Sequence, residues 1–428
     1  MINSQLADEG FTLLKNDGTL PMDLDGAKVS LVGKSSFDIL RGGSGSGAGS
    51  VARGVTAEDV ESSLKAVGAE VNPTLKSFYG DSKSGPGRGN GNDNWKGNSQ
   101  VQIGETPISA YGDAELDSMD EYSDLAIQVI TREGSEGCDV KAIDARDFDP
   151  RSSKGSGPFA YDEITDKHAL ELTDNEQDLF DELHEHFDHI VIIVNSSNII
   201  ECGQFQNDPK VAGVLWIGNP GDVGPGAVGR ILSGQVNPSG HTVDTWMADF
   251  KKDPTYQNFS DNSQTSDKTF KTNDGSYFSK TENYASQDTM FNADGTPTRS
   301  YGTDKSYSNP SSPRWLNEEN KVVQSGINGV KPSAYVSYEE GIYLDYRYYE
   351  TKYDDMKAAG QDADSWYNGE EGVVYPFGFG LSYTTFEQKI VSSNIANKVL
   401  KSGNMKVEVK VNVKNTGDAA WSIRSVPI

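Results

Sequence analysis

Apolar positions fall into two patterns along this chain: short continuous runs, and residues that recur at helical spacing. A continuous run of five to eight apolar residues is typical of a strand buried on both faces of a parallel sheet. Such runs lie at 28–33, 123–130, 190–194 and 211–217. Helical spacing predicts helices over 60–67, after Thr173 and over 227–232. Because strands and helices alternate, we predict a flavodoxin-like α/β sandwich with a mainly parallel sheet and right-handed crossovers.

Three local patterns predict particular elements. Residues 3–16 carry apolar side chains near helical spacing, which predicts a short helix followed by a turn at Asn16–Gly18. Thr173-Asp-Asn-Glu176 has the form of a capping box, in which two side chains bond the first N–H groups of a helix. Residues 405–413 alternate strictly between apolar and polar, which predicts a half-buried antiparallel strand.

The periodicity disappears after Trp246, and residues 253–313 are rich in Ser, Thr, Asn and Asp. Sixty residues without an element are unusual within a compact domain, so this stretch indicates an insertion. We therefore predict four parts: an α/β sandwich over 1–250, a loop-rich insertion over 251–334, a segment over 335–387 that returns to pack on the sandwich, and an incomplete β-sandwich over 388–428.

Charge and cysteine content narrow the function classes. With 64 acidic against 38 basic residues, the formal charge of -26 disfavours nucleic acid and anionic membranes as partners. Cys138 and Cys202 form neither a disulfide-rich scaffold nor a zinc motif. His184, His186 and His189 lie near one predicted helix end, where solvated side chains are a plainer interpretation than a metal site. The start of the sequence shows no secretory signal and no run of eighteen apolar residues occurs, which favours a cytoplasmic location.

The stretch Ile127–Asp139 is the first candidate for chemistry, because an apolar run there breaks into a glycine-flanked acidic loop. Open α/β sheets place their functional crevice at the carboxyl ends of the strands. Glu136, between Ser135 and Gly137, would lie at such an end. A Glu in a glycine-rich loop is often only a solvated turn residue, and that reading stays open at this point.

Two loops are candidates for ligand contact. The glycine-rich run 41–49 lacks the spacing of a phosphate-binding motif, so we favour a wall without side chains that lets backbone approach a ligand. Residues 78–100 are rich in Gly, Ser, Asn and Asp, and Trp95 stands alone among them. Its ring could stack on a sugar face or anchor the loop by packing.

Seven motifs in order resemble the C-terminal part of glycoside hydrolase family 3, the β-glucosidase group, in members where this part precedes the barrel. They are 10–16 (GFTLLKN), 42–47 (GGSGSG), 135–139 (SEGCD), 219–221 (NPG), 237–240 (NPSG), 340–348 (EGIYLDYRY) and 375–386 (YPFGFGLSYTTF).

The resemblance implies retaining hydrolysis of a β-glucoside or a related carbohydrate by two carboxylates, without a cofactor or a metal. The family's nucleophile is an Asp of a Ser-Asp-Trp motif on a TIM barrel, and this chain has neither, so a barrel domain or chain is the expected partner and the chain alone is expected to be inactive. The position that matches the family's acid/base is Glu136. Glu133 is the second candidate, since it lies on the same loop.

The resemblance also concerns neighbouring residues. Arg132 and Asp139 match flanking positions, and they would either contact substrate or order the loop through ion pairs. His241 stands where the family usually has Arg or Lys. The sequence 421–428 departs from the family's fibronectin type III-like domain, so we expect residues 388–428 to be an incomplete form of it.

Two other functions remain open on the sequence. The first is a non-catalytic module that presents Trp95 and the Tyr-rich insertion to a carbohydrate or a partner. The second is a nucleotide-binding flavodoxin-like domain. Binding of glucose, cellobiose or FMN would separate the three functions.

Overall fold

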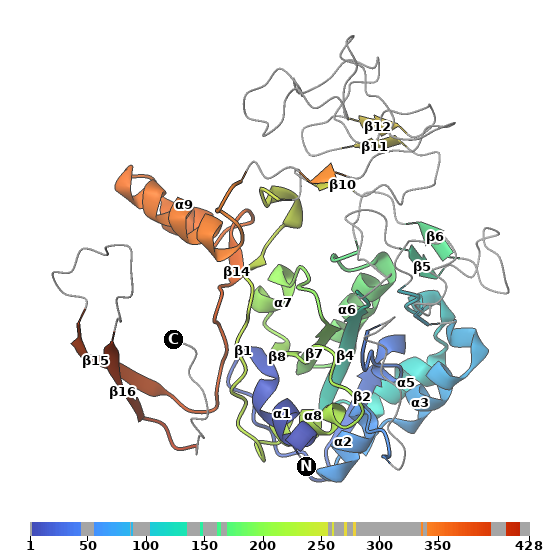
Figure 1. The fold of residues 1–428 in the computed structure, drawn as a ribbon. Coiled ribbons are helices and arrows are strands. Elements are labelled where there is room, and N and C mark those ends of the chain that lie inside the picture. Colours follow the sequence, from blue (N-terminus) through green and yellow to red (C-terminus); the bar gives the residue numbers. More distant parts are fainter. Residues whose placement is uncertain are drawn as a thin grey trace.

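A six-stranded sheet with the order β1-β8-β7-β4-β2-β3 forms the centre of the described part of the chain (Figure 1). The computed structural model describes residues 2–43, 55–85, 87–88, 103–134, 146–148, 161–163, 169–255, 259–260, 269–271, 277–279, 335–336, 340–394 and 408–419. The six strands are β1 (Thr12–Asn16), β2 (Lys28–Val32), β3 (Glu70–Val71), β4 (Leu125–Arg132), β7 (Ile190–Ser196) and β8 (Val211–Trp216). All neighbours pair in parallel except β1, which runs antiparallel to β8 at one edge. The predicted mainly parallel sheet is confirmed.

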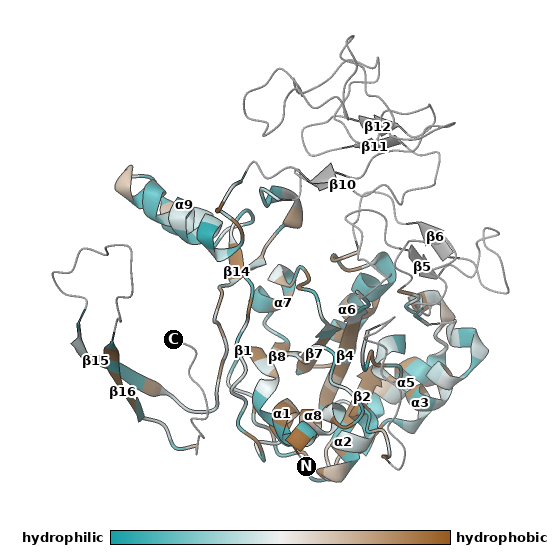
Figure 2. Ribbon diagram, viewed as in Figure 1, coloured by the Kyte–Doolittle hydropathy of each residue, from teal (hydrophilic) through white to brown (hydrophobic). Residues whose placement is uncertain are grey.

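Alternate residues of each strand belong to two separate cores, one on each face of the sheet. Leu13, Leu31 and Ile127 pack on one face, whereas Leu14 and Val32 pack on the other. The first face is covered by α1 (Ile2–Gly10), α2 (Val60–Ala66) and α8 (Ala227–Leu232). The second face is covered by α3 (Pro73–Gly80), α5 (Asp113–Glu121), α6 (Asp174–His186) and α7 (Gly203–Asn207). Figure 2 shows the hydrophobic residues gathered on the central strands between these helices.

The central strands of the sheet coincide with the apolar runs of the sequence. Every residue of β4 and β7 is buried, as the continuous run Ile190–Val194 predicts for a central strand. The capping box of α6 is also confirmed, because the Thr173 hydroxyl accepts from the Glu176 N–H at 3.2 Å and the Glu176 carboxylate accepts from the Thr173 N–H at 2.9 Å.

The prediction of one helix over residues 3–16 is wrong in its second half. The helix ends at Gly10, and Thr12–Asn16 forms the antiparallel edge strand β1. Leu13 and Leu14 pack on opposite faces of the sheet, which is the alternation of a strand, although their spacing also fits a helix. The predicted turn is present, with the Asn16 side chain accepting from the Gly18 N–H at 2.9 Å.

Residues 373–375 pack against the sandwich through a small two-stranded sheet. β14 (Val373–Tyr375) pairs antiparallel with β9 (Trp246–Met247). The rings of Trp246 and Tyr375 meet edge to face at 5.9 Å, and the Leu381 N–H donates to the Leu13 carbonyl at 2.8 Å. The helices α9 (Tyr346–Ala358) and α10 (Ala363–Tyr367) adjoin this sheet through the buried Tyr349.

The last described element is an antiparallel hairpin of β15 (Phe386–Ser393) and β16 (Val409–Asn415). The prediction of a half-buried strand near 405–413 is correct in type but wrong in burial, because Val411 is 43% exposed and its neighbours Ile390 and Val391 are 65% and 64% exposed. Three short strand pairs complete the strands of the described residues: β5 (Arg146–Phe148) with β6 (Tyr161–Glu163), β10 (Phe259–Ser260) with β13 (Tyr335–Val336), and β11 (Thr269–Lys271) with β12 (Tyr277–Ser279). Among the described residues, no helix has the length and apolar character to cross a membrane.

Candidate active site

Four parallel strands, β2, β4, β7 and β8, point their carboxyl ends to the same edge of the sheet, and β2 ends four residues before β4. The last pairings place Val32 beside Gln128, Arg132 beside Ser196, and Val194 beside Trp216. This carboxyl edge is where open α/β sheets bind ligands, because the loops that leave the strands converge there. The side chains at this carboxyl edge are therefore candidates for ligand binding and catalysis.

Arg132 ends β4 and is completely buried. Its Nη1 and Nη2 donate to the two carboxylate oxygens of Glu176 at 2.8 and 2.6 Å, which makes a bidentate ion pair. Nη1 also donates to the Thr131 carbonyl at 2.9 Å, Nη2 to the Glu171 carbonyl at 2.7 Å, and Nε to the Ala169 carbonyl. The five N–H groups of a guanidinium are thus all used within the protein. Of the two roles that the sequence left open for Arg132, the structure shows an ion pair.

Glu133, the next residue, carries a carboxylate that is mostly buried at the strand end. Its side chain is 12% exposed, and Oε2 lies 3.6 Å from Nη1 of Arg88. Nη2 of Arg88 lies 3.2 Å from Oδ2 of Asp38, so one guanidinium serves two carboxylates. Burial raises the pKa of Glu133 and the Asp38 charge adds to this rise, although Arg88 opposes it. A carboxyl with a raised pKa is suited to donating a proton near neutral pH.

Asn195, at the penultimate position of β7, bonds the backbone of two loops that follow β2 and β8. Its buried side-chain oxygen accepts from the Leu40 N–H at 2.5 Å. Its amide nitrogen donates to the carbonyls of Leu40 at 2.9 Å and Gly218 at 2.7 Å. The residues after Leu40 open the glycine-rich run 41–49, of which residues 41–43 are described, and the Gly221 N–H donates to the Arg41 carbonyl at 2.8 Å. The start of that run is therefore fixed to the carboxyl edge.

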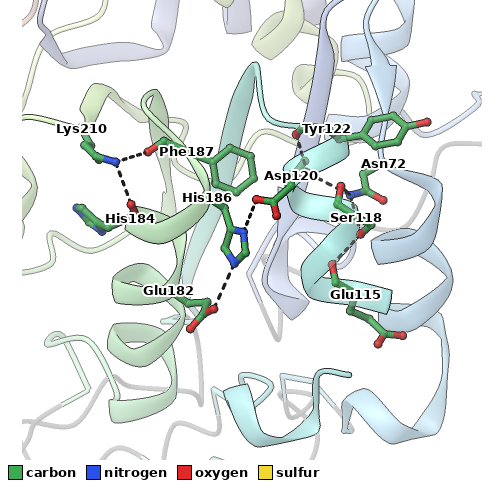
Figure 3. Close-up of polar contacts among 11 residues, drawn as sticks. Asn72, Glu115, Ser118, Asp120, Tyr122, Glu182, His184, His186, Phe187 and Lys210 are labelled. Carbon is green, nitrogen blue, oxygen red and sulfur yellow. Dashed lines mark hydrogen bonds and ion pairs between the residues drawn. The ribbon is translucent and has the colours of Figure 1, made fainter. Parts of the chain in front are cut away.

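The histidines of α6 contact carboxylates, and Figure 3 shows those of His186. His186 lies between Asp120 on α5 and Glu182 on its own helix, with N–O distances of 2.7 and 3.2 Å. His184 contacts the Asp208 carboxylate at 2.8 Å. No group of three or more His, Cys, Asp or Glu side chains is placed to hold a metal ion within the described residues.

Several predicted site residues lie outside the described residues. These are Glu136, Asp139 and Trp95. Conversely, sequence patterns did not single out Asn195, Arg88 or Asp38. Asn195 is the first polar residue after an apolar run, and this position at a strand end was an available signal.

The fold and the strand-end carboxylates define an α/β sandwich domain with a titratable site at the carboxyl edge of its sheet. The chain belongs to the glycosyl hydrolase family 3 C-terminal domain, whose family model matches residues 11–346.

Relatives and solved structures agree with this membership. Beta-glucosidase A of Butyrivibrio fibrisolvens is 25% identical over 399 residues, which are 90% of this chain and 35% of that protein. A beta-glucosidase of Ruminococcus albus is 28% identical over 254 residues, or 59% of this chain and 23% of that protein. The chain thus spans about a third of the length of the first relative and a quarter or less of the second.

Two solved structures share the fold. The beta-glucosidase of Paenibacillus barengoltzii matches with a TM-score of 0.55 and 21% identity, covering 97% of this chain and 32% of that one. Beta-glucosidase 3B of Thermotoga neapolitana, in complex with glycerol, matches with a TM-score of 0.56 and 20% identity, covering 97% of this chain and 41% of that one. At these identities the similarity establishes the fold.

Proposed function

We propose that this chain is the sandwich domain of a β-glucosidase-type glycoside hydrolase and supplies the general acid/base, Glu136, for retaining hydrolysis of O-glycosidic bonds. One observation supports this function: in a chain of this family, the sequence Ser135-Glu-Gly137 comes two residues after β4, a strand whose carboxyl end lies at the edge where α/β sheets bind ligands. The nucleophile would come from a barrel domain, on the same polypeptide or on a partner.

The proposed chemistry has two proton transfers. In the first step, the protonated Glu136 carboxyl gives its proton to the leaving oxygen while the nucleophile forms the glycosyl-enzyme bond and the glycosidic C–O bond breaks. In the second step, water attacks the anomeric carbon, the glycosyl-enzyme bond breaks and releases the nucleophile carboxylate, and the Glu136 carboxylate takes the proton from that water and so returns to the acid form.

Glu133 is the rival for the same role. Its partly buried carboxyl and raised pKa suit a general acid. Its contact with Arg88 favours the carboxylate form and a structural role instead. Both residues follow β4 closely in the sequence, so each carboxyl is replaced by an amide in turn to find which one is the acid/base.

The test is to join or mix the chain with a family 3 barrel domain and to measure turnover of cellobiose and of an activated aryl glucoside. Glu136→Gln should lower kcat on cellobiose by about 10²- to 10⁴-fold, because this disaccharide needs an acid to expel its leaving group. The loss on the aryl glucoside should be smaller, since an activated leaving group departs without a proton.

Glu133→Gln is the matched control, and it should leave cellobiose turnover within a few-fold of the unchanged chain. If Glu133→Gln removes turnover and Glu136→Gln does not, the acid/base is Glu133. Undiminished cellobiose turnover in both variants would reject the proposed function. Calorimetric titration of the chain with FMN gives a further check, since tight binding would favour a nucleotide-binding function.

A further inference from the structure

Two arginines at the carboxyl edge differ in how far their N–H groups are used. The terminal nitrogens of Arg132 donate at 2.6–2.9 Å, and all five of its N–H groups have partners within the protein. Arg88 makes longer contacts: Nη2 lies 3.2 Å from Oδ2 of Asp38 and 3.4 Å from the Asp38 carbonyl oxygen, and Nη1 lies 3.6 Å from Oε2 of Glu133. Its Nε has no hydrogen-bond partner in the part of the chain that the structure describes. Arg88 therefore has hydrogen-bonding capacity left for a ligand, whereas Arg132 has none.

The backbone that carries Arg88 is packed against the end of β2. Gly87, the residue before it, has a φ of 73°, and a Cβ added there would lie 3.0 Å from Cγ of Lys34. A Cβ added to Gly104 would lie 2.1 Å from the Gly87 carbonyl oxygen. Lys34 comes two residues after β2, and its Nζ donates to the Ser84 hydroxyl at 2.6 Å. Close packing thus fixes the backbone at this position, which leaves the guanidinium preorganised for a ligand at little cost in conformational entropy.

The charges around the guanidinium limit the kind of ligand. Two carboxylates, those of Asp38 and Glu133, lie beside the one guanidinium of Arg88, and the chain as a whole has a formal charge of -26. This surplus of negative charge repels an anion such as phosphate. A cation would meet the positive charge of Arg88 itself. The surroundings therefore favour a neutral ligand.

Arg88 and Asp38 offer a donor and an acceptor side by side. The Asp38 side chain is 62% exposed and that of Arg88 is 17% exposed, so the carboxylate reaches solvent while the guanidinium lies mostly below the surface. A hydroxyl group both donates and accepts hydrogen bonds. On a sugar ring, one hydroxyl can donate to the carboxylate while its neighbour accepts from the guanidinium. A carbohydrate is thus a neutral ligand whose hydrogen bonding fits this pair.

We propose that Arg88, paired with Asp38, binds hydroxyl groups of the carbohydrate substrate at the carboxyl edge. The inference takes its ligand class from the function proposed above, but it does not depend on which carboxyl is the acid/base. A hydrogen bond to a charged group typically changes an affinity by about 10- to 100-fold. Loss of this contact should therefore be visible as weaker substrate binding.

Binding is measured by calorimetric titration with thiocellobiose, a disaccharide whose sulfur bridge resists hydrolysis, on the chain joined to a family 3 barrel. Arg88→Met keeps most of the side-chain length but removes the donors, so the Kd should rise about 10-fold or more. Arg88→Lys keeps the charge without the planar fork, and its Kd should lie between the two. In turnover of cellobiose, Arg88→Met should raise KM by a similar factor while kcat stays within a few-fold, as expected for a contact made equally in the ground state and the transition state.

Asp38→Asn tests the ligand class. The amide oxygen still accepts a hydrogen bond, but one negative charge is removed, so thiocellobiose should bind a few-fold more weakly. An anion would instead bind more tightly to this variant, because the surplus of negative charge has gone. Inorganic phosphate is the comparison ligand. If phosphate binds the unchanged protein more tightly than thiocellobiose does, the site is an anion site and the inference is wrong.

Two controls separate binding from folding. Arg230→Met removes another arginine, whose ion pair of 2.7 Å with Asp8 lies on helices that cover the first face of the sheet, and it should leave the Kd for thiocellobiose unchanged. Urea unfolding of Arg88→Met should stay close to that of the unchanged chain, because long contacts to an exposed carboxylate contribute little stability. A loss of stability as large as that of Arg132→Met, which leaves a buried carboxylate unpaired, would assign Arg88 a structural role and overturn the inference.

The kinetic outcomes distinguish this inference from the acid/base assignment. Glu136→Gln should lower kcat with little change in the Kd for thiocellobiose, whereas Arg88→Met should raise the Kd and KM. If Glu136→Gln keeps its turnover while Arg88→Met weakens thiocellobiose, the acid/base assignment fails and the carbohydrate contact stands. Unchanged Kd and KM in Arg88→Met, or no binding of thiocellobiose by the unchanged joined protein, would reject the carbohydrate contact whichever carboxyl is the acid.

Discussion

Asn195 offers a direct test of how the carboxyl edge of the sheet is assembled. Its amide nitrogen donates to two carbonyls, those of Leu40 and Gly218, while its oxygen accepts from the Leu40 N–H. Asn195→Asp keeps the size and the acceptor but replaces the donor by a second oxygen. Two carbonyl oxygens then face an oxygen at distances now between 2.7 and 2.9 Å, in a site without exposure to water.

The loss of folding free energy in Asn195→Asp depends on pH, because the introduced carboxyl is titratable. Burial and the two carbonyls favour its neutral form, so its pKa in the folded state lies above the unfolded value of about 3.9. Below about pH 3.9 the carboxyl is neutral in both states. Above that pH, each unit costs about 1.4 kcal/mol of folding free energy until the folded pKa is reached. At neutral pH the charged carboxyl should therefore cost at least the roughly 1–3 kcal/mol of an unsatisfied buried polar group.

Asn195→Ala is the matched comparison, because it removes the same hydrogen bonds without adding a titratable group. Loss of the side chain leaves buried backbone groups of Leu40 and Gly218 without their partner, which should cost about 3 kcal/mol at every pH. Urea unfolding followed by tryptophan fluorescence at about pH 4.5 and about pH 7 measures both variants against the unchanged chain. Parallel pH dependence of the two variants would refute the assigned donation to two carbonyls.

Two further predictions concern contacts between helices. The His186 ring is held by Asp120 and a carboxylate of its own helix; burial lowers its pKa, but these two hydrogen bonds outweigh burial and raise it above the usual value. The stabilisation from these ion pairs should be complete below about pH 6.5 and lost as the pH rises through the folded pKa. The urea midpoint of His186→Gln should therefore converge on that of the unchanged chain at alkaline pH. A difference in midpoint that stays the same at every pH would contradict the ion pairs. Gly229→Ala would place a Cβ 2.2 Å from the Ser63 carbonyl oxygen, where α8 crosses α2. The resulting steric clash should outweigh the higher helix propensity of Ala and lower the free energy of unfolding by about 1–2 kcal/mol. Gly80→Ala, with nothing within 4 Å of the added Cβ, should be neutral or stabilising in the same urea titration, and equal effects would disprove the close crossing.

The sequence predicted the elements whose burial is uniform. Ile190–Val194 was recognisable as a central strand because both of its faces contact helices, so no polar residue interrupts the run. Thr173 and Glu176 marked the start of α6, since a capping box involves only residues three positions apart. The helix α5 was missed because its packed face is narrow: Ser118 and Met119 are its only buried residues.

Segments that depend on a distant partner were predicted less well. Leu13 and Leu14 fit a helix as well as a strand, and pairing with β8, some two hundred residues away, decided between them. The role of Arg132 was likewise open on the sequence. Its five donors could be assigned only when residues 169–176 were seen to fold back against the end of β4.

The sequence by itself thus predicted the central strands with their mainly parallel sheet, the family, and the glycine-flanked Glu136 as candidate acid. These depend on local periodicity and on short motifs, which are complete within a few neighbouring residues. Only the tertiary structure decided how the carboxyl edge is fixed. It is fixed by hydrogen bonds between residues far apart in the chain, such as Arg132 with Glu176 and Asn195 with Leu40. The sequence does not identify these pairs, because a polar side chain bonds whichever group lies next to it once both are buried.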